Sequence, residues 1–215
     1  MIITAQKPLD EILDFLSPYD SILIAGCDGC TQPPRGLREA KTLVQLLELG
    51  GKLRGKNFNL RATTLPKQCD SYLTLTALQS QIQGIQAIVS LACGLGVQTI
   101  TQVLPDCPAF PSQNTLFMGS EIREDNTLEE RCAACGDCML AITGGICPVA
   151  RCAKSLLNGP CGGSQHGKCE IDPGKDCAWD LIIKRLERLG RLAALQEIRT
   201  PRNFGQVVRP GKITE

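Results

Sequence analysis

The chain has 215 residues, enough for one large domain or two modest ones, and a formal net charge of +1 at pH 7. This near-neutral charge and an aromatic content of 4% give little positive field and little stacking surface for nucleic acid. No apolar run approaches the roughly 20 residues of a membrane span, and the N-terminus MIITAQKPLDEIL lacks the pattern of an export signal. We therefore expect a cytoplasmic protein whose 13 cysteines face a reducing environment and serve as metal ligands.

The first half of the sequence alternates helical patterns with short apolar runs. The spacing of apolar residues predicts helices at residues 9–16, 36–49, 72–82 and 97–104. The second of these helices is expected to stop at Gly50 and Gly51. Apolar runs predict strands at residues 21–26, 58–64, 87–92 and 115–118. This alternation predicts the α/β class, with a parallel-sheet, flavodoxin- or Rossmann-like N-terminal domain at residues 1–118.

Four cysteines of this half come at or just after the ends of predicted strands. Cys27 and Cys30 follow the first strand, Cys69 lies beyond the second, and Cys93 ends the third. Because the carboxyl ends of parallel strands share one edge of the sheet, we expect a four-thiolate site there. The alternative is a thioredoxin-like CxxC redox pair with two unrelated buried cysteines. Cys107 is left over and is expected to be a free thiol.

Residues 105–130 are expected to link two domains, because three prolines are followed by a run of acidic residues. The second domain, at residues 119–215, is expected to be small and cysteine-rich, with a C-terminal helix at residues 179–198. Its tail from residue 199 onward, with two prolines and two glycines, is expected to be disordered or ordered by a partner.

Eight cysteines lie between Cys132 and Cys177. The first three are separated by two residues each, which is how a ferredoxin-type run begins, and one later cysteine precedes a proline, which is how such a run ends. Eight thiolates satisfy two four-iron clusters, so the pattern predicts a ferredoxin-like iron–sulfur domain. The eight candidate ligands are Cys132, Cys135, Cys138, Cys147, Cys152, Cys161, Cys169 and Cys177.

Two other uses of these thiols stay open. A disulfide framework is disfavoured in a reducing compartment. Two structural zinc sites also need eight thiolates, although zinc sites usually show paired CxxC motifs rather than a triple. The one histidine, His166, is a possible zinc ligand, but the surrounding glycines favour a solvated loop. Zinc in the C-terminal domain therefore remains the alternative to clusters.

The spacing also suggests how the eight thiolates divide. A triple with two-residue gaps surrounds one corner of a cluster, so its fourth ligand must come from elsewhere in the chain. We expect this fourth ligand to be Cys177, at the start of the terminal helix, whose dipole favours a thiolate. The other cluster would then take Cys147, Cys152, Cys161 and Cys169. The main alternative gives Cys147 to the triple, because that closes a shorter loop.

The strings NGPCGG, GKCE and DCAW, within the stretch from Cys132 to Trp179, also carry a family resemblance. This stretch resembles the cysteine-rich C-terminal domain of methylenetetrahydrofolate reductases. The whole chain resembles, more loosely, the MetV-type small subunit of the acetogen-type enzyme. The resemblance implies a non-catalytic electron-transfer subunit with three four-iron, four-sulfur clusters. It also implies a flavoprotein partner whose FMN receives electrons from a low-potential donor such as ferredoxin, and which reduces methylenetetrahydrofolate to methyltetrahydrofolate.

Two other functions remain possible on the sequence alone. One is an interaction module stabilised by zinc, without a redox role. The other is a stand-alone enzyme that binds substrate at an open iron position of the first site. Neither a Ser/His/Asp set nor a carboxylate pair is evident, so the chain lacks the parts of an acid–base catalyst.

Overall fold

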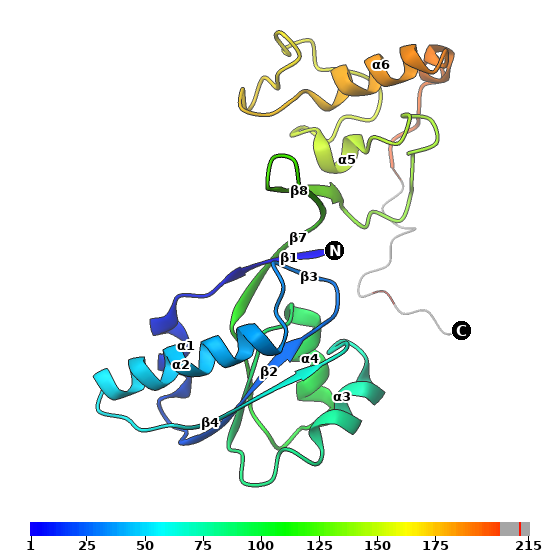
Figure 1. Cartoon of the computed structure of the whole chain (residues 1–215). Helices are drawn as coiled ribbons and strands as arrows, with labels where there is room; N and C mark the ends of the chain where they lie inside the picture. Colours follow the sequence, from blue (N-terminus) through cyan, green and yellow to red (C-terminus); the bar gives the residue numbers. More distant parts are fainter. Residues whose placement is uncertain (203–210, 212–215) are drawn as a thin grey trace. The chain divides into compact units, whose positions relative to one another are not determined.

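A computed structural model describes residues 1–202 and 211, and the chain divides into two compact units, Met1–Phe117 and Met118–Glu215 (Figure 1). The predicted disorder of the tail falls largely on residues 203–210 and 212–215, which lie outside the described residues. Within the described part of the chain, no helix has the length and apolar character needed to cross a membrane. The two units are described separately below.

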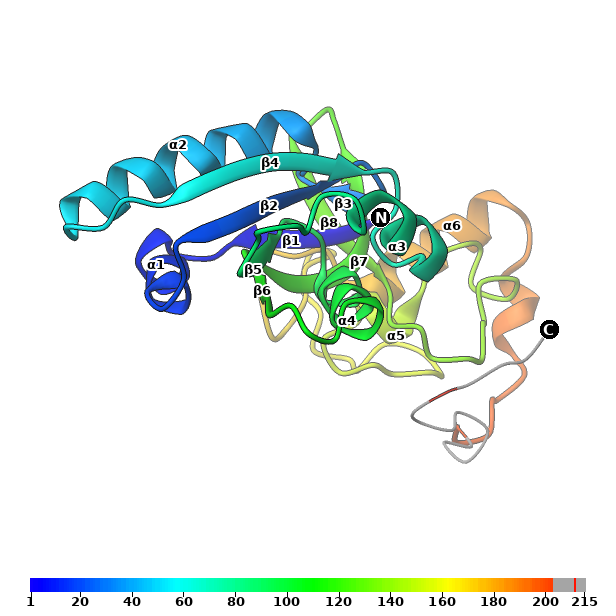
Figure 2. The ribbon, with the colours of Figure 1, turned by 90° about the horizontal axis from the view of Figure 1, so that it is seen from below.

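The first unit contains a four-stranded parallel sheet, which confirms the predicted α/β class. Its strands are β2 (Ser21–Cys27), β4 (Asn59–Leu65), β5 (Ala87–Ser90) and β6 (Ala109–Pro111). They lie in the order β4–β2–β5–β6 (Figure 2). Numbered along the chain within this sheet, the order is 2-1-3-4, as in doubly wound flavodoxin-like sheets. The topological switch point therefore lies between β2 and β5.

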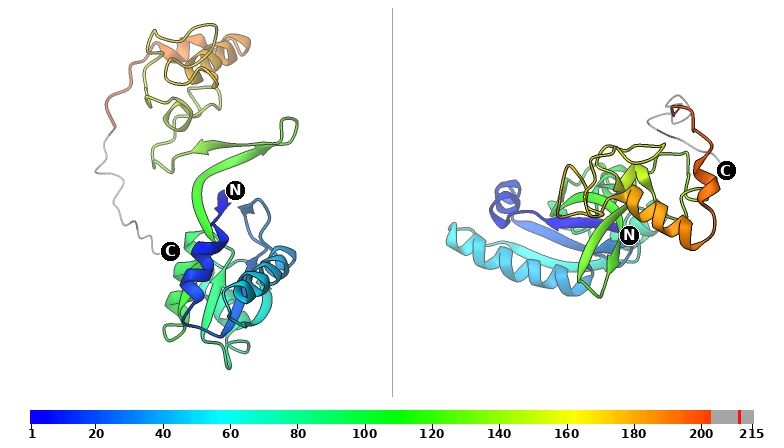
Figure 3. Two further views of the ribbon diagram at one scale, coloured as in Figure 1. Left: turned by 90° about the vertical axis from the view of Figure 1, so that its left-hand side faces the viewer. Right: turned by 90° about the horizontal axis from the view of Figure 1, so that it is seen from above.

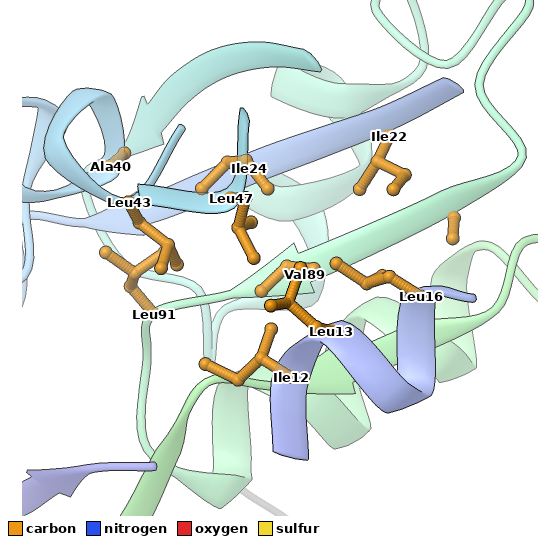
Figure 4. Close-up of a cluster of buried hydrophobic side chains, with 11 residues drawn as sticks. Ile12, Leu13, Leu16, Ile22, Ile24, Ala40, Leu43, Leu47, Val89 and Leu91 are labelled. Atoms are coloured by element: carbon orange, nitrogen blue, oxygen red, sulfur yellow. The ribbon is translucent and has the colours of Figure 1, made fainter. Parts of the chain in front are cut away.

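Helices cover both faces of this sheet (Figure 1). Those on one face are α1 (Leu9–Leu16) and α2 (Leu37–Leu53), and those on the other are α3 (Ser71–Leu78) and α4 (Gly94–Val103). Alternate residues of β2 point to opposite faces, so that Ile22 and Ile24 pack with α1 and α2, while Leu23 and Ala25 pack with α3 and α4. Figure 4 shows the first of these clusters, with side chains of both helices directed at β2 and β5.

The predicted end of α2 at Gly50 and Gly51 is wrong, because the helix continues to Leu53. Both glycines are needed for close packing instead. A Cβ atom on Gly50 would lie 2.7 Å from Leu13 Cδ1 of α1, and one on Gly51 would lie 2.7 Å from Phe58 Cδ2. The glycines therefore let α2 approach its neighbours, a role that a sequence pattern does not distinguish from termination.

The predicted linker at residues 105–130 contains the boundary between the two units, but it holds more strand than the one expected at residues 115–118. β6 completes the parallel sheet, and β7 (Gln113–Ile122) forms an antiparallel hairpin with β8 (Thr127–Cys132). β7 carries the chain across the boundary between the units (Figure 3). In the first unit, β7 neighbours β1 (Ile2–Gln6), which pairs in parallel with the two-residue β3 (Thr31–Gln32). Neither β1 nor β3 was expected from the sequence.

The second unit has little regular structure after β8 (Figure 3). It contains the four-residue α5 (Pro148–Arg151), then α6 (Ala178–Arg188) and the 3-10 helix η1 (Leu192–Leu195). The predicted helix at residues 179–198 is therefore two helices, because Gly190 adopts a left-handed conformation with φ of 64°. Trp179, Ile182 and Leu186 of α6 form the small core of this unit together with Cys177. The ferredoxin-like fold of this unit stays a prediction.

Candidate metal centres

The first candidate centre lies at the carboxyl edge of the parallel sheet. Cys27 is the last residue of β2, Cys93 follows β5 as the N-cap of α4, and Cys69 lies between β4 and α3. Since β2 and β5 are neighbours, Cys27 and Cys93 stand on either side of the switch point, where open α/β sheets bind ligands. The two thiols are largely enclosed, with exposures of 8% and 6%.

Cys69 follows β4, the neighbour of β2, and therefore lies at the same edge of the sheet as Cys27 and Cys93. Burial raises the pKa of the Cys69 thiol, Lys67 opposes this, and the charges of Cys93 and Cys27 raise the pKa further. The three thiols are therefore close enough to influence one another. Cys30 is exposed and lies in the loop after β2, where its carbonyl accepts a hydrogen bond from the Ile2 amide at 2.9 Å. The structure thus brings three of the four predicted residues together and leaves Cys30 nearby in sequence.

Gln68 holds the strand ends of this edge in register. The side chain is fully buried, and its amide nitrogen donates to the carbonyl oxygens of Ala25 and Gly26 at 2.9 and 2.6 Å. Its amide oxygen accepts from Ser90 Oγ at 2.6 Å, and its backbone oxygen accepts from Thr74 Oγ1 at 2.9 Å. The side chain of Gln68 therefore ties β2 to β5, and its backbone carbonyl ties this residue to α3. Nothing in the sequence pattern indicated this role.

Four thiols of the second unit line one pocket. They come from three loop positions and from the residue before α6, and they are Cys152, Cys161, Cys169 and Cys177. The remaining walls are largely apolar and include Trp179, Pro160 and Ile171. Cys152 also packs against the buried cluster that contains Cys177. The pocket is therefore a four-thiol site enclosed in part by the core of the unit.

Backbone hydrogen bonds fix the loops that carry these thiols. The amide of Cys169 donates to the Lys175 carbonyl at 2.9 Å, and the amide of Cys177 donates to the Gly167 carbonyl at 2.8 Å. Trp179 Nε1 donates to the Leu156 carbonyl at 3.0 Å and fastens the start of α6 to the chain near Cys152. The bond between the Cys177 amide and Gly167 therefore holds Cys177 beside the loop that carries Cys169.

The cysteine triple lies in a curled loop directly after β8. Ala134 and Gly136 have positive φ values of 47° and 76°, and the Ala134 amide donates to Cys132 Sγ at 3.4 Å. Loops of this kind turn successive amides inward and form concavities that suit anions and iron–sulfur sites. Cys135 and Cys138 complete the triple in this loop.

Cys147 is brought toward the triple by α5. It is the N-cap of α5, which packs against β8, the strand that ends at Cys132. An ion pair of 3.5 Å between Arg151 of α5 and Glu129 of β8 fastens this contact. The structure therefore groups Cys147 with the strand that leads into the triple.

The expected pairing of Cys177 with the triple stays a prediction, although the structure places Cys177 in a pocket with other thiols. Cys177 lines the pocket of Cys152, Cys161 and Cys169, and Cys147 belongs to the α5–β8 contact instead. The physical reason is local. Hydrogen bonds within residues 165–177 hold Cys177 beside Cys169, and the sequence argument, from the spacing of the triple and the helix dipole, did not include them.

His166 and Cys107 lie apart from these groups of thiols in their local environments. His166 is exposed at a turn with φ of 51°, in the glycine-containing loop where the sequence placed it. Cys107 packs against the core on the α3–α4 face, and burial raises the pKa of its thiol. A neutral, half-buried thiol at this position fits the expectation of a free cysteine.

The donor chemistry of all three groups is that of thiolates alone, which suits both iron–sulfur clusters and structural zinc. Within the described residues, no three His, Cys, Asp or Glu side chains lie close enough to hold a metal ion. The four-thiol pocket supplies the ligand type and number of one such site, whereas the loop of the triple and the sheet edge each present three of the four thiols.

The comparison with protein families gives a match over the cysteine-rich part of the chain. Residues 110–205 match the family model described as "Methylene-tetrahydrofolate reductase C terminal". This match supports a protein related to methylenetetrahydrofolate reductase and covers all eight cysteines of the second unit. Neither the curated proteins nor the solved structures contain a match to this chain.

Proposed function

We propose that the chain is an iron–sulfur electron-transfer subunit that works with a methylenetetrahydrofolate reductase. It would hold three four-iron clusters, one at the sheet edge and two in the second unit. The sheet-edge ligands are Cys27, Cys30, Cys69 and Cys93. The ligands in the second unit form two groups: Cys132, Cys135, Cys138 and Cys147 in group A, and Cys152, Cys161, Cys169 and Cys177 in group B. Bound clusters store and pass single electrons.

The pocket lined by the four group B thiols carries this proposal. Four-iron clusters take four thiolate ligands, and burial together with hydrogen bonding to sulfur sets their potentials. The pocket provides four thiols, partial enclosure by Trp179, and a helix whose N-terminus follows Cys177. It also lies within the part of the chain that matches the reductase family.

The chain's own residues would position the clusters rather than perform proton chemistry. At the sheet edge, Gln68 fixes the strand ends, and the N-terminus of α4 favours a thiolate at its N-cap, Cys93. In the second unit, the hydrogen bonds of residues 165–177 perform the same task for group B. The partner expected from the family is a flavoprotein subunit, whose FMN would receive electrons from a low-potential donor such as ferredoxin and reduce methylenetetrahydrofolate.

Metal analysis of the full chain, purified without oxygen, tests this function. The expected preparation is brown, contains about twelve iron atoms and as much acid-labile sulfide per chain, as three four-iron clusters require, and loses visible absorbance on reduction with dithionite. Co-purification of a flavoprotein would support the proposed reaction. Stoichiometric zinc without sulfide would overturn the redox role.

A zinc-stabilised interaction module is the second candidate. The same pocket supports it, because four thiolates packed against a small core also describe a structural zinc site. This module would be colourless, would carry zinc, and would lose the fold of the second unit on chelation. Iron and sulfide at the expected content would exclude it.

A further inference from the structure

Arginine side chains gather around group A. Arg202 Nη2 donates to the Cys135 carbonyl at 3.0 Å, and its guanidinium also acts on the Cys135 thiol. A positive charge therefore lies beside this candidate ligand.

Two further arginines lie where β8 meets α5. Arg131 and Arg151 share the single carboxylate of Glu129, at 2.6 and 3.5 Å. Arg131 precedes Cys132, and its Nε is buried without a hydrogen-bond acceptor. Arg151 follows Cys147 by one helical turn, and the charges of its guanidinium group and of the Cys147 thiol interact. Two guanidinium groups beside group A thus have one carboxylate between them.

The other carboxylates near group A do not remove this excess of positive charge. Asp137 pairs with Arg199 at 3.1 Å, and Glu130 points from the opposite face of β8 to Glu129. Asp176 acts on Arg151 at longer range, but it pairs with Lys168 at 2.7 Å. Counted over the residues that the structure describes, arginines outnumber carboxylates around group A.

The charges around group B are balanced instead. Lys154 pairs with Glu170 at 2.8 Å, and three further lysine–carboxylate pairs lie nearby, at 2.7, 3.3 and 2.8 Å: Lys168–Asp176, Lys175–Asp172 and Lys184–Asp180. Glu170 also accepts a hydrogen bond from Cys161 Sγ at 3.1 Å, and Lys154 interacts with the same thiol, so that a paired carboxylate and ammonium lie against one of the four sulfurs. Once that sulfur is a thiolate, the carboxylate repels added negative charge.

Reduction adds one negative charge to a cluster, and net charge near the cluster is one of the factors that set its potential. Positive groups favour the reduced state and carboxylates disfavour it. We propose that the group A site holds its cluster at a more positive reduction potential than the group B site, because Arg131, Arg151 and Arg202 surround the former and Glu170 contacts the latter. This inference rests on the proposed iron–sulfur function. It makes group A the preferred place for an electron within the second unit.

Redox titration of the full chain, followed by electron paramagnetic resonance, tests the order of the potentials. Cys135→Ser and Cys161→Ser first assign the signals of groups A and B. The group A signal should appear at the more positive potential. Arg202→Gln should shift the group A midpoint to more negative values and leave group B unchanged, while Arg202→Lys, which keeps the charge, should retain most of the native value.

Glu170→Gln tests the same inference from the other side, since it should move the group B midpoint to more positive values. Arg188→Gln, an exposed site on α6, is the matched control and should move neither midpoint. Clusters in the reverse order, or midpoints unmoved by both Arg202→Gln and Glu170→Gln, would overturn this inference and leave the proposed function intact. Zinc without sulfide would overturn both.

Discussion

The two units of this protein place cysteines on different kinds of scaffold. In the first unit, the thiols lie at the edge of a sheet that is buried on both faces by two apolar clusters. In the second unit, eight thiols lie on loops and short helices around a buried cluster of four residues, one of which is itself a candidate ligand. The first scaffold can fold on apolar burial, whereas the second is too small to do so without its metals.

Removal of the metals should therefore unfold the second unit and leave the first unit folded. This is the largest effect that we expect. Oxidative loss of clusters in the presence of a chelator should remove hydrogen-exchange protection from α6 and leave the amides of β2, β4 and β5 protected. Hydrogen exchange with mass spectrometry on the full chain measures both regions at once. Persistence of protection in α6 would contradict the comparison between the scaffolds.

Loss of a single ligand should be confined to one group of thiols. We expect Cys177→Ser to remove about four iron atoms, one cluster's worth, and to alter the same spectroscopic signal as Cys161→Ser. Cys147→Ser should instead alter the signal that Cys135→Ser alters. Cys27→Ala serves as a control from the other unit and should leave both of these signals in place. A shared signal for Cys177→Ser and Cys135→Ser would restore the pairing expected from the sequence spacing.

The sequence predicted three strands of the parallel sheet because β2 and β5 are continuous apolar runs and the strands alternate with helices along the chain, but it missed β6, and the fourth strand that it predicted belongs to β7. It did not predict β8, because acidic residues such as Glu129 were interpreted as part of a linker, whereas Glu129 pairs with Arg131 on the same strand and with Arg151 of α5. It also placed a helix end at Gly50, where the close approach of Leu13 explains the glycine. A pattern of neighbouring residues predicts the role of such a residue correctly only when the residues that it contacts are also close in the sequence.

The candidate sites show the same limit. The twelve cysteines stand out by spacing and by their position after strands, but their division into groups depends on loop hydrogen bonds such as that between Cys177 and Gly167. Gln68, Glu170 and Arg202 carry no motif, and their roles appear only when distant segments of the chain are brought together.

The scaffold of the first unit can be tested without touching a cysteine. Gln68→Leu removes the amide that serves Ala25, Gly26 and Ser90, and leaves these buried groups without a partner. The expected cost is about 3 kcal/mol, from several unsatisfied groups. It should appear as reduced exchange protection in β2 and β5 together with loss of the iron of the first unit. Gln98→Leu is the matched control, because this exposed side chain bonds only within α4, and it should change neither.

Among the four changes considered in this comparison, Thr74→Val should have the smallest effect. Thr74 is fully buried, and its hydroxyl donates one hydrogen bond to the Gln68 carbonyl at 2.9 Å. Valine keeps the branched shape, so the loss is that of one hydrogen bond, about 1 kcal/mol, and hydrogen exchange in α3 measures it. The exposed Thr42→Val is the control, and its effect should stay within about 0.5 kcal/mol. Because the amide of Gln68 remains, the iron content of the first unit should be unchanged. A cost equal to that of Gln68→Leu, with loss of iron, would mean that the docking of α3 rather than the amide of Gln68 holds the sheet edge together.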